Sequence, residues 1–175
     1  IRIYNRPLND GEINELAQDA AQAQVGASYN SAATGLLSHY EFASGAAAAP
    51  AGPTGGTLAA SGAPTAVVGK DGDTNGASQY SGNPDRYIAS ETGLPMGNHP
   101  RTACAWVRPF VYPTSGGFIS ILSYGNPAST QMFSLGMRHD FGTNTQHVSM
   151  LNFGAPLSRQ LALPLQTWSH ICGTH

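Results

Sequence analysis

Short runs in which hydrophobic and polar residues alternate cover most of the chain, and this period-two pattern predicts β-strands. In the opening run, residues 1–6, Ile1 and Ile3 fall on one face and their neighbours on the other. Turn residues such as Gly, Pro and Asn separate the later runs, which cover residues 35–42, 85–90, 101–109, 118–124, 131–138, 147–153 and 168–174. Strands of this length and spacing are typical of an all-β sandwich.

One short helix is predicted directly after the first strand. Pro7 ends that strand because proline has no N–H to donate to a ladder. Asn9, followed three residues later by Glu12, has the spacing of a capping box at a helix start. Apolar residues at helical spacing continue the pattern to Ala20.

Two segments are poor in large apolar residues and predict irregular structure. Residues 22–33 are small and polar, as in a linker. Residues 43–66 consist almost entirely of Ala, Gly, Pro, Ser and Thr, so we expect a surface loop there.

The amino-acid composition limits the functional classes to which the protein can belong. Only 10% of the 175 residues are charged, Lys70 is the only lysine, and the formal net charge is −2. Without a basic stripe, a nucleic-acid partner bound through its phosphates is not expected. No apolar run approaches the ~18–20 residues that span a bilayer, so membrane insertion is not expected. A Gly-, Ser-, Thr- and Asn-rich chain of this kind is typical of a secreted or cell-surface β-protein.

Several motifs, taken in order, carry a resemblance to a known family. They are T-G-L-L-S-H-Y-E-F (34–42), T-A-C-A-W-V-R-P (102–109) and W-S-H-I-C-G-T (168–174). Residues 34–175 thereby resemble the laminin-G-like, concanavalin A-like jelly-roll domains of secreted multidomain proteins. The resemblance implies a two-sheet antiparallel jelly-roll sandwich in which Trp106 and Trp168 are buried.

The opening I-R-I-Y-N-R-P-L-N-D-G-E-I resembles the closing strand and helix of the same family, yet it stands first. The simplest interpretation is two tandem modules. Residues 1–25 would close a preceding module, 26–33 would be a linker, and 34–175 would form a module incomplete at its C-terminus. A circular permutation, or subunits that exchange this strand with neighbouring copies, are the alternatives.

Asp71, Asp73 and Asn75 form a D-x-D-x-N-G sequence with Gly76, the opening half of an oxygen-rich calcium loop. Calcium recurs in the resembled family, which makes these residues candidate calcium ligands, with Asp85 as a candidate additional ligand. Gly82 stands where an EF-hand needs its bidentate Glu, which excludes that motif. A solvated turn is the alternative, because Asp, Asn and Gly favour turns.

Catalytic residues are not expected. The glutamates are scattered, whereas jelly-roll glycoside hydrolases carry two facing acids on one strand. The chain has no G-x-S-x-G motif. Its histidines lack metal-ligand spacing, and His170 is expected to be structural.

Cys104 and Cys172 could form a disulfide, which an extracellular location would permit. Two buried reduced thiols are the interpretation we favour from sequence, since free Cys packs as a small hydrophobe. Tyr112 and Tyr124 lie in turn-rich stretches and are the better candidates for stacking on a sugar or a partner, although we favour a structural role even for these two.

Together these features predict a non-catalytic extracellular binding or adhesion module that recognises a glycan or a surface protein. One alternative is a structural subunit of an extracellular filament or coat, joined by strand exchange. Another is an accessory domain of a carbohydrate-active enzyme. Members of the resembled family share a scaffold while their loops differ, so the ligand is expected to depend on the loops.

Overall fold

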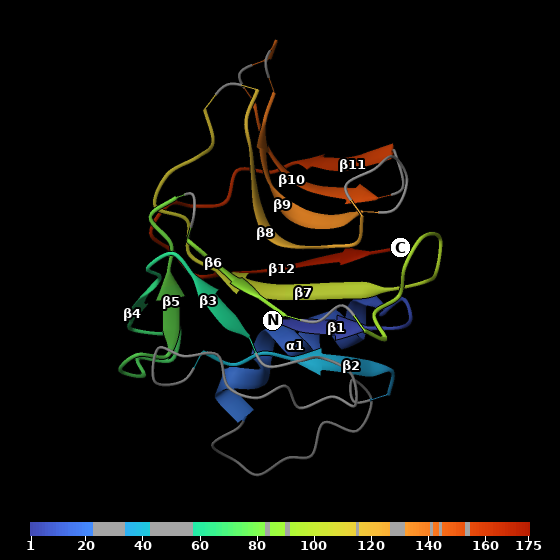
Figure 1. The fold of residues 1–175 in the computed structure, drawn as a ribbon, viewed down its shortest axis with the longest axis horizontal. Helices are drawn as coiled ribbons and strands as arrows, with labels where there is room; N and C mark the ends of the chain where they lie inside the picture. The colour runs from blue at the N-terminus through green and yellow to red at the C-terminus, as the bar shows by residue number, and fades with distance from the viewer. Residues whose placement is uncertain are drawn as a thin grey trace. The chain divides into compact units, whose positions relative to one another are not determined.

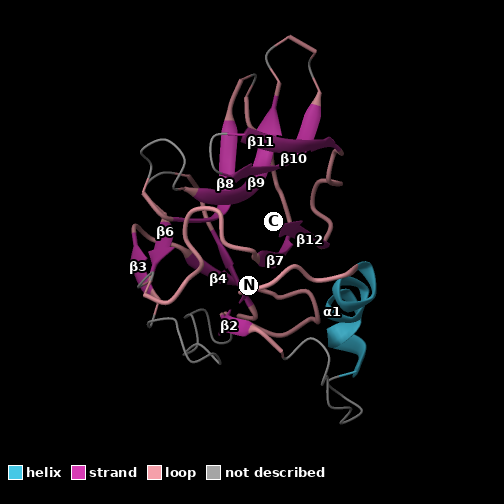
Figure 2. Ribbon diagram, turned by 90° about the vertical axis from the view of Figure 1, so that its right-hand side faces the viewer, coloured by secondary structure: helices cyan, strands magenta, loops and turns pink. Residues whose placement is uncertain are grey.

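The computed structural model describes residues 1–22, 34–42, 58–82, 85–89, 92–114, 116–126, 132–140, 142–143, 145–152 and 155–175 (Figure 1). These residues form two compact units, Ile1–Leu94 and Pro95–His175, and each is described by itself below. The strand pairs are antiparallel, and the described residues contain one helix (Figure 2). The prediction of a mostly β protein with one N-terminal helix is therefore confirmed, while the jelly-roll arrangement stays a prediction.

The first unit joins its opening strand to a strand of the same chain. β1 (Arg2–Tyr4) pairs with β2 (Leu36–His39), with Ile3 opposite Ser38. Backbone bonds extend the pairing, since the N–H of Tyr40 donates to the carbonyl of Ile1 at 2.8 Å. Two further ladders pair β3 (Ala59–Ser61) with β6 (Arg86–Ile88), and β4 (Thr65–Val67) with β5 (Ala77–Gln79).

The helix α1 (Asp10–Gln22) begins with the predicted capping box. The N–H of Glu12 donates to Asn9 Oδ1 at 3.0 Å, and the N–H of Asn9 donates to Glu12 Oε2 at 2.9 Å. The backbone N–H groups of Asn9 and Glu12, at the start of the helix, thus both donate to side-chain acceptors. The helix buries Leu16, and Leu8 just before it is also buried.

In the second unit, a four-stranded sheet lies over a two-stranded ladder (Figures 1 and 2). The sheet has the order β11 (Ala155–Gln160), β10 (Gln146–Asn152), β9 (Phe133–His139) and β8 (Phe118–Tyr124). The ladder pairs β7 (Thr102–Val107) with β12 (Ser169–Thr174).

The two layers of this unit approach closely at Gly173. A Cβ built there would lie 2.8 Å from Met150 Sδ and 3.3 Å from Leu135 Cδ1, so glycine makes room for the sheet above it. Leu135, Met150 and Ile171 are all buried at this contact. Because side chains alternate along a strand, the neighbours of Ile171 and Gly173 on β12 point to the opposite face of the ladder.

Two expectations about irregular segments need correction. Residues 43–66 were expected to be a loop throughout, but β3 and the start of β4 lie within them, while residues 43–57 are outside the described part. β5 and β11 were not expected either. The linker is also largely outside the described residues, which resume at Thr34.

Candidate functional site

The predicted calcium loop is a tight turn that joins β4 to β5. The carbonyl of Asp73 accepts the N–H groups of Gly69 and Gly76, both at 3.0 Å. Asn75 takes a positive φ of 64°, as Asn tolerates better than most residues. Asp71 pairs with Lys70 at 2.7 Å. These contacts are those of the alternative, a solvated turn, and calcium binding stays a prediction.

Asp85, the candidate additional calcium ligand, joins two loops through hydrogen bonds. Its Oδ1 accepts the N–H of Ala63 at 2.8 Å, and its Oδ2 accepts the N–H of Ser81 at 2.9 Å. These two backbone bonds lower the pKa of Asp85, which therefore stays ionised at neutral pH. Gly62 has a φ of +82° and a Cβ there would lie 2.8 Å from the Asp85 Cα, so the loop passes close to this residue.

The two tyrosines considered for ligand stacking both contact other residues of the chain. Tyr124 is only 4% exposed, and its ring packs on Phe133 with the Arg101 guanidinium 5.9 Å from its centroid. This burial fits the structural role that the sequence favours for Tyr124. The hydroxyl of Tyr112 donates to the carbonyl of Leu163, which fixes it between two loops.

An aromatic cluster in the first unit was not anticipated. It consists of Phe42, which lies three residues after β2, Tyr80, which directly follows β5, and Tyr87, which lies in β6. The Phe42 and Tyr87 rings lie 5.5 Å apart, and Tyr80 meets Tyr87 edge to face at 6.1 Å. Tyr80 is 44% exposed, whereas Ser78 contacts the Tyr87 hydroxyl at 3.3 Å. The cluster thus offers a fixed aromatic surface with hydroxyl groups at its edge.

Electrostatics keep the Tyr80 hydroxyl protonated. Desolvation against its neighbours raises the pKa of Tyr80, and the nearby Tyr87 raises it further. The hydroxyl can therefore both donate and accept a hydrogen bond at physiological pH. The signal used for Tyr112, an aromatic residue beside turn residues, also applies to Tyr80, which precedes Ser81 and Gly82.

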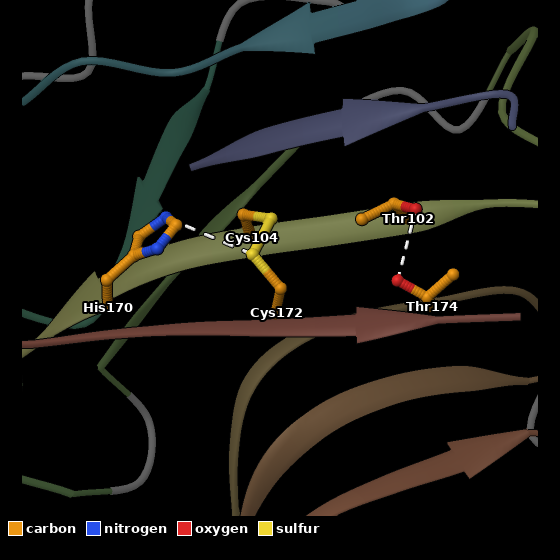
Figure 3. Close-up of a disulfide and its surroundings, with 5 residues drawn as sticks. All are labelled: Thr102, Cys104, His170, Cys172 and Thr174. Atoms are coloured by element: carbon orange, nitrogen blue, oxygen red, sulfur yellow. Dashed lines mark hydrogen bonds between the residues drawn. A yellow bond between two sulfur atoms is a disulfide. The ribbon is translucent and has the colours of Figure 1, made fainter. Parts of the chain in front are cut away.

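Cys104 and Cys172 form a disulfide, so the expectation of two reduced thiols is wrong. They are directly opposite each other in the β7–β12 register, with their Cα atoms 4.1 Å apart. His170 shares their face of the ladder, and its Nε2 lies 4.0 Å from Cys172 Sγ (Figure 3). Thr102 and Thr174 pair at 3.3 Å on the same face.

A histidine next to a carboxylate and a hydroxyl occurs at the start of β10. Asp140 Oδ2 lies 2.9 Å from His147 Nε2, and Thr145 Oγ1 lies 2.8 Å from that same nitrogen. A relay from acid through imidazole to nucleophile needs the two ring nitrogens to hold different partners. These contacts therefore do not form such a relay.

Within the described part of the chain, one group of three potential metal ligands lies close together, and it consists of Cys104, His170 and Cys172. No helix among the described residues has the length and apolar character needed to cross a membrane. No family model, curated protein or solved structure matches this chain. The fold and the contacts define a mostly β protein with a surface aromatic cluster and a disulfide within one ladder.

Proposed function

We propose that this protein is a non-catalytic extracellular binding module that recognises a glycan through the Phe42–Tyr80–Tyr87 cluster. The observation that carries the proposal is the exposed ring of Tyr80, held edge to face by Tyr87. An aromatic side chain with a polar tip suits a ligand that is apolar on one face and hydroxylated at its edges, as a pyranose ring is.

The surroundings of the cluster favour a preformed site. The Asp85 carboxylate accepts the N–H groups of Ala63 and Ser81, and Ser81 directly follows Tyr80, so the backbone next to Tyr80 is restrained. A site whose shape exists before binding loses less conformational entropy when the ligand arrives. Hydroxyl groups of Ser78 and Tyr80 supply hydrogen-bonding partners for a sugar.

An extracellular location is the part of the proposal that the disulfide supports. Disulfides persist in oxidising compartments and are rare where thiol reductants keep cysteines reduced. The resemblance to laminin-G-like domains points the same way. A jelly-roll module of that type would carry its binding residues on loops, as this cluster partly does.

The structure gives less support to the alternative functions. A filament joined by strand exchange would need β1 to pair with another copy, and β1 already pairs with β2 of its own chain. An accessory domain of a carbohydrate-active enzyme would use the same aromatic cluster, so it is a variant of the main proposal. Recognition of a surface protein in place of a glycan would show in the experiment below as a failure to bind any oligosaccharide.

The test is binding to a panel of gluco-, manno- and galacto-oligosaccharides, followed by calorimetry on those that bind. Tyr80→Ala should weaken binding at least about tenfold, on the order of 1.4 kcal/mol, because it removes the stacking ring. Tyr80→Phe should retain most of the affinity if stacking dominates.

Phe110→Ala is the matched control, since Phe110 is 46% exposed but belongs to the other unit. Its affinity should equal that of the unmodified protein. The proposal is wrong if no oligosaccharide of the panel binds, or if Tyr80→Ala and Phe110→Ala bind equally well.

A further inference from the structure

Three side chains with metal-binding atoms converge on one face of the β7–β12 ladder (Figure 3). The Sγ atoms of Cys104 and Cys172 and a ring nitrogen of His170 all lie within 4.8 Å of one another. In the oxidised protein the two sulfurs are bonded to each other. Only a thiolate is a good metal ligand, so the disulfide blocks metal binding.

We propose that reduction of the Cys104–Cys172 disulfide converts this group into a binding site for a zinc-type divalent cation. The site would be a Cys2His site, controlled by the redox state of the protein. It is independent of the aromatic cluster, which belongs to the other unit.

The redox step balances with a dithiol as the reductant. The dithiol attacks one sulfur, the S–S bond breaks, and the second thiol of the reductant closes its own ring disulfide. Two electrons and two protons pass to Cys104 and Cys172, which become thiols. When the cation binds, the two thiol protons leave to solvent and both sulfurs bind as thiolates.

Distances around His170 suit a tetrahedral site. Zinc binds thiolate sulfur at about 2.3 Å and imidazole nitrogen at about 2.0–2.1 Å, which places the two ligand atoms about 3.5 Å apart. The observed distance between His170 Nε2 and Cys172 Sγ is 4.0 Å. A small rotation of the imidazole therefore brings the nitrogen into range.

The ladder holds the ligands together without the disulfide. β7 and β12 stay in register from Thr102 opposite Thr174 to Val107 opposite Ser169. Beyond the ladder, the backbones of Arg101 and His175 exchange two hydrogen bonds, both at 2.9 Å. These contacts keep opposed Cα atoms near their present separation after reduction, and rotation about the Cα–Cβ bonds lets the sulfurs part.

The Cys104–His170–Cys172 group is partly buried and partly accessible to solvent. Cys104 is 2% exposed, and the Trp106 ring lies against His170 with centroids 5.2 Å apart. Cys172 and His170 are only partly buried, so a reductant and a cation can reach them from that side. The fourth position of a tetrahedral site is left for water.

The experiment uses the full chain and Co²⁺ as a spectroscopic probe. The protein is reduced with a dithiol, the dithiol is removed without oxygen, and Co²⁺ is titrated. One equivalent should produce a thiolate-to-cobalt charge-transfer band, which Zn²⁺ then removes by displacement. The oxidised protein and Cys104→Ala/Cys172→Ala should give no band.

His170→Ala separates the proposed site from unspecific thiolate binding. His99→Ala is the control, because His99 is exposed and does not belong to the group of ligand atoms that converges on the two cysteines. His170→Ala should weaken Co²⁺ binding about tenfold or more, while His99→Ala leaves it unchanged. Near-ultraviolet circular dichroism of each reduced variant checks the fold, and Zn²⁺ should restore any signal lost on reduction. Absence of the band in reduced protein, equal affinity of the two histidine variants, or no recovery with Zn²⁺ would each overturn the proposal.

Discussion

At the scale of single residues, Glu12 combines two roles. Its carboxylate caps α1 through Asn9 and also receives both terminal nitrogens of Arg6, at 2.6 and 3.0 Å. The hydrogen bonds from Arg6 are the main cause of the low pKa of Glu12, about 2, and the bond from Asn9 adds to it. The bidentate geometry fixes the turn between β1 and the helix.

Glu12→Gln should therefore change how stability depends on acid. The pKa of Glu12 is lower in the folded chain than in the unfolded chain, so the carboxylate stabilises the fold above about pH 4.5 and loses this effect as the pH falls toward 2. The unmodified protein should be the more stable at about pH 6, and the two should converge near pH 2. Urea unfolding followed by circular dichroism at several pH values measures this.

Asp10→Asn serves as control for that experiment because Asp10 is exposed in the same first turn. At about pH 6, Asp10→Asn should lose less stability than Glu12→Gln, because an exposed carboxylate near a helix N-terminus contributes only about 0.3–1 kcal/mol. A constant difference between Glu12→Gln and the unmodified protein across the whole range would contradict the assignment of the acid dependence to Glu12.

At the scale of elements, the sheet β11-β10-β9-β8 carries a row of small residues across all four strands. Ser120, Gly136, Ser149 and Ser158 are paired in register. Ser149 and Ser158 are hydrogen-bonded at 2.7 Å, and Ser120 reaches Ser134 at 2.9 Å. A one-residue slip would move these hydroxyls to the other face, so the row helps to fix the register.

Gly136→Ala should destabilise the protein by about 1–3 kcal/mol. A Cβ at this position would lie 2.3 Å from the carbonyl oxygen of Ile119, and a strand backbone cannot move aside as a flexible side chain can. Gly142→Ala is the matched control, because a Cβ there meets nothing within 4 Å, and its effect should stay within about 0.5 kcal/mol. Denaturant unfolding measures the stability of both variants. Equal stabilities of Gly136→Ala and Gly142→Ala would contradict the close approach of the Ile119 carbonyl oxygen to Gly136.

The sequence predicts elements where the local signals are strong. α1 has a capping box and helical spacing, and β7 and β12 have clear alternation around Trp106 and His170. β3 is Ala-Ala-Ser, too short and too small to show a period. β11 contains Pro156, which argues against a strand, but it lies at the edge of its sheet, where a missing N–H is tolerated.

The candidate site could be predicted only in part, because its residues come from distant segments. The sequence favours reduced thiols for Cys104 and Cys172, because their direct opposition depends on a strand register that the sequence does not determine. Phe42, Tyr80 and Tyr87 meet only once β2, β5 and β6 are placed. Tyr124 lies beside turn residues in the sequence, yet it is buried and packs on Phe133, with the Arg101 guanidinium over its ring.

At the scale of the whole molecule, the disulfide closes a long loop. Cys104 and Cys172 are 68 positions apart, and a loop of this size restricts the unfolded chain by about 4 kcal/mol in the entropy model. Cys104→Ala/Cys172→Ala should lose stability of that order in urea unfolding. Both tryptophans, Trp106 and Trp168, lie in the second unit, so their fluorescence reports the affected part.

A reductant supplies the control for this prediction. It should lower the stability of the unmodified protein and leave that of the double variant unchanged. If the double variant is as stable as the oxidised protein, the cross-link does not stabilise the fold.

The position of the Cys104–Cys172 disulfide in the chain also determines how the molecule responds to mechanical tension. β8 to β11 all lie between the two cysteines in sequence. A pulling force applied at points before Cys104 and after Cys172 passes through the covalent S–S bond and leaves the enclosed sheet unloaded. In reducing surroundings the same force would extend the 67 intervening residues, so the redox state sets how far this unit can be stretched.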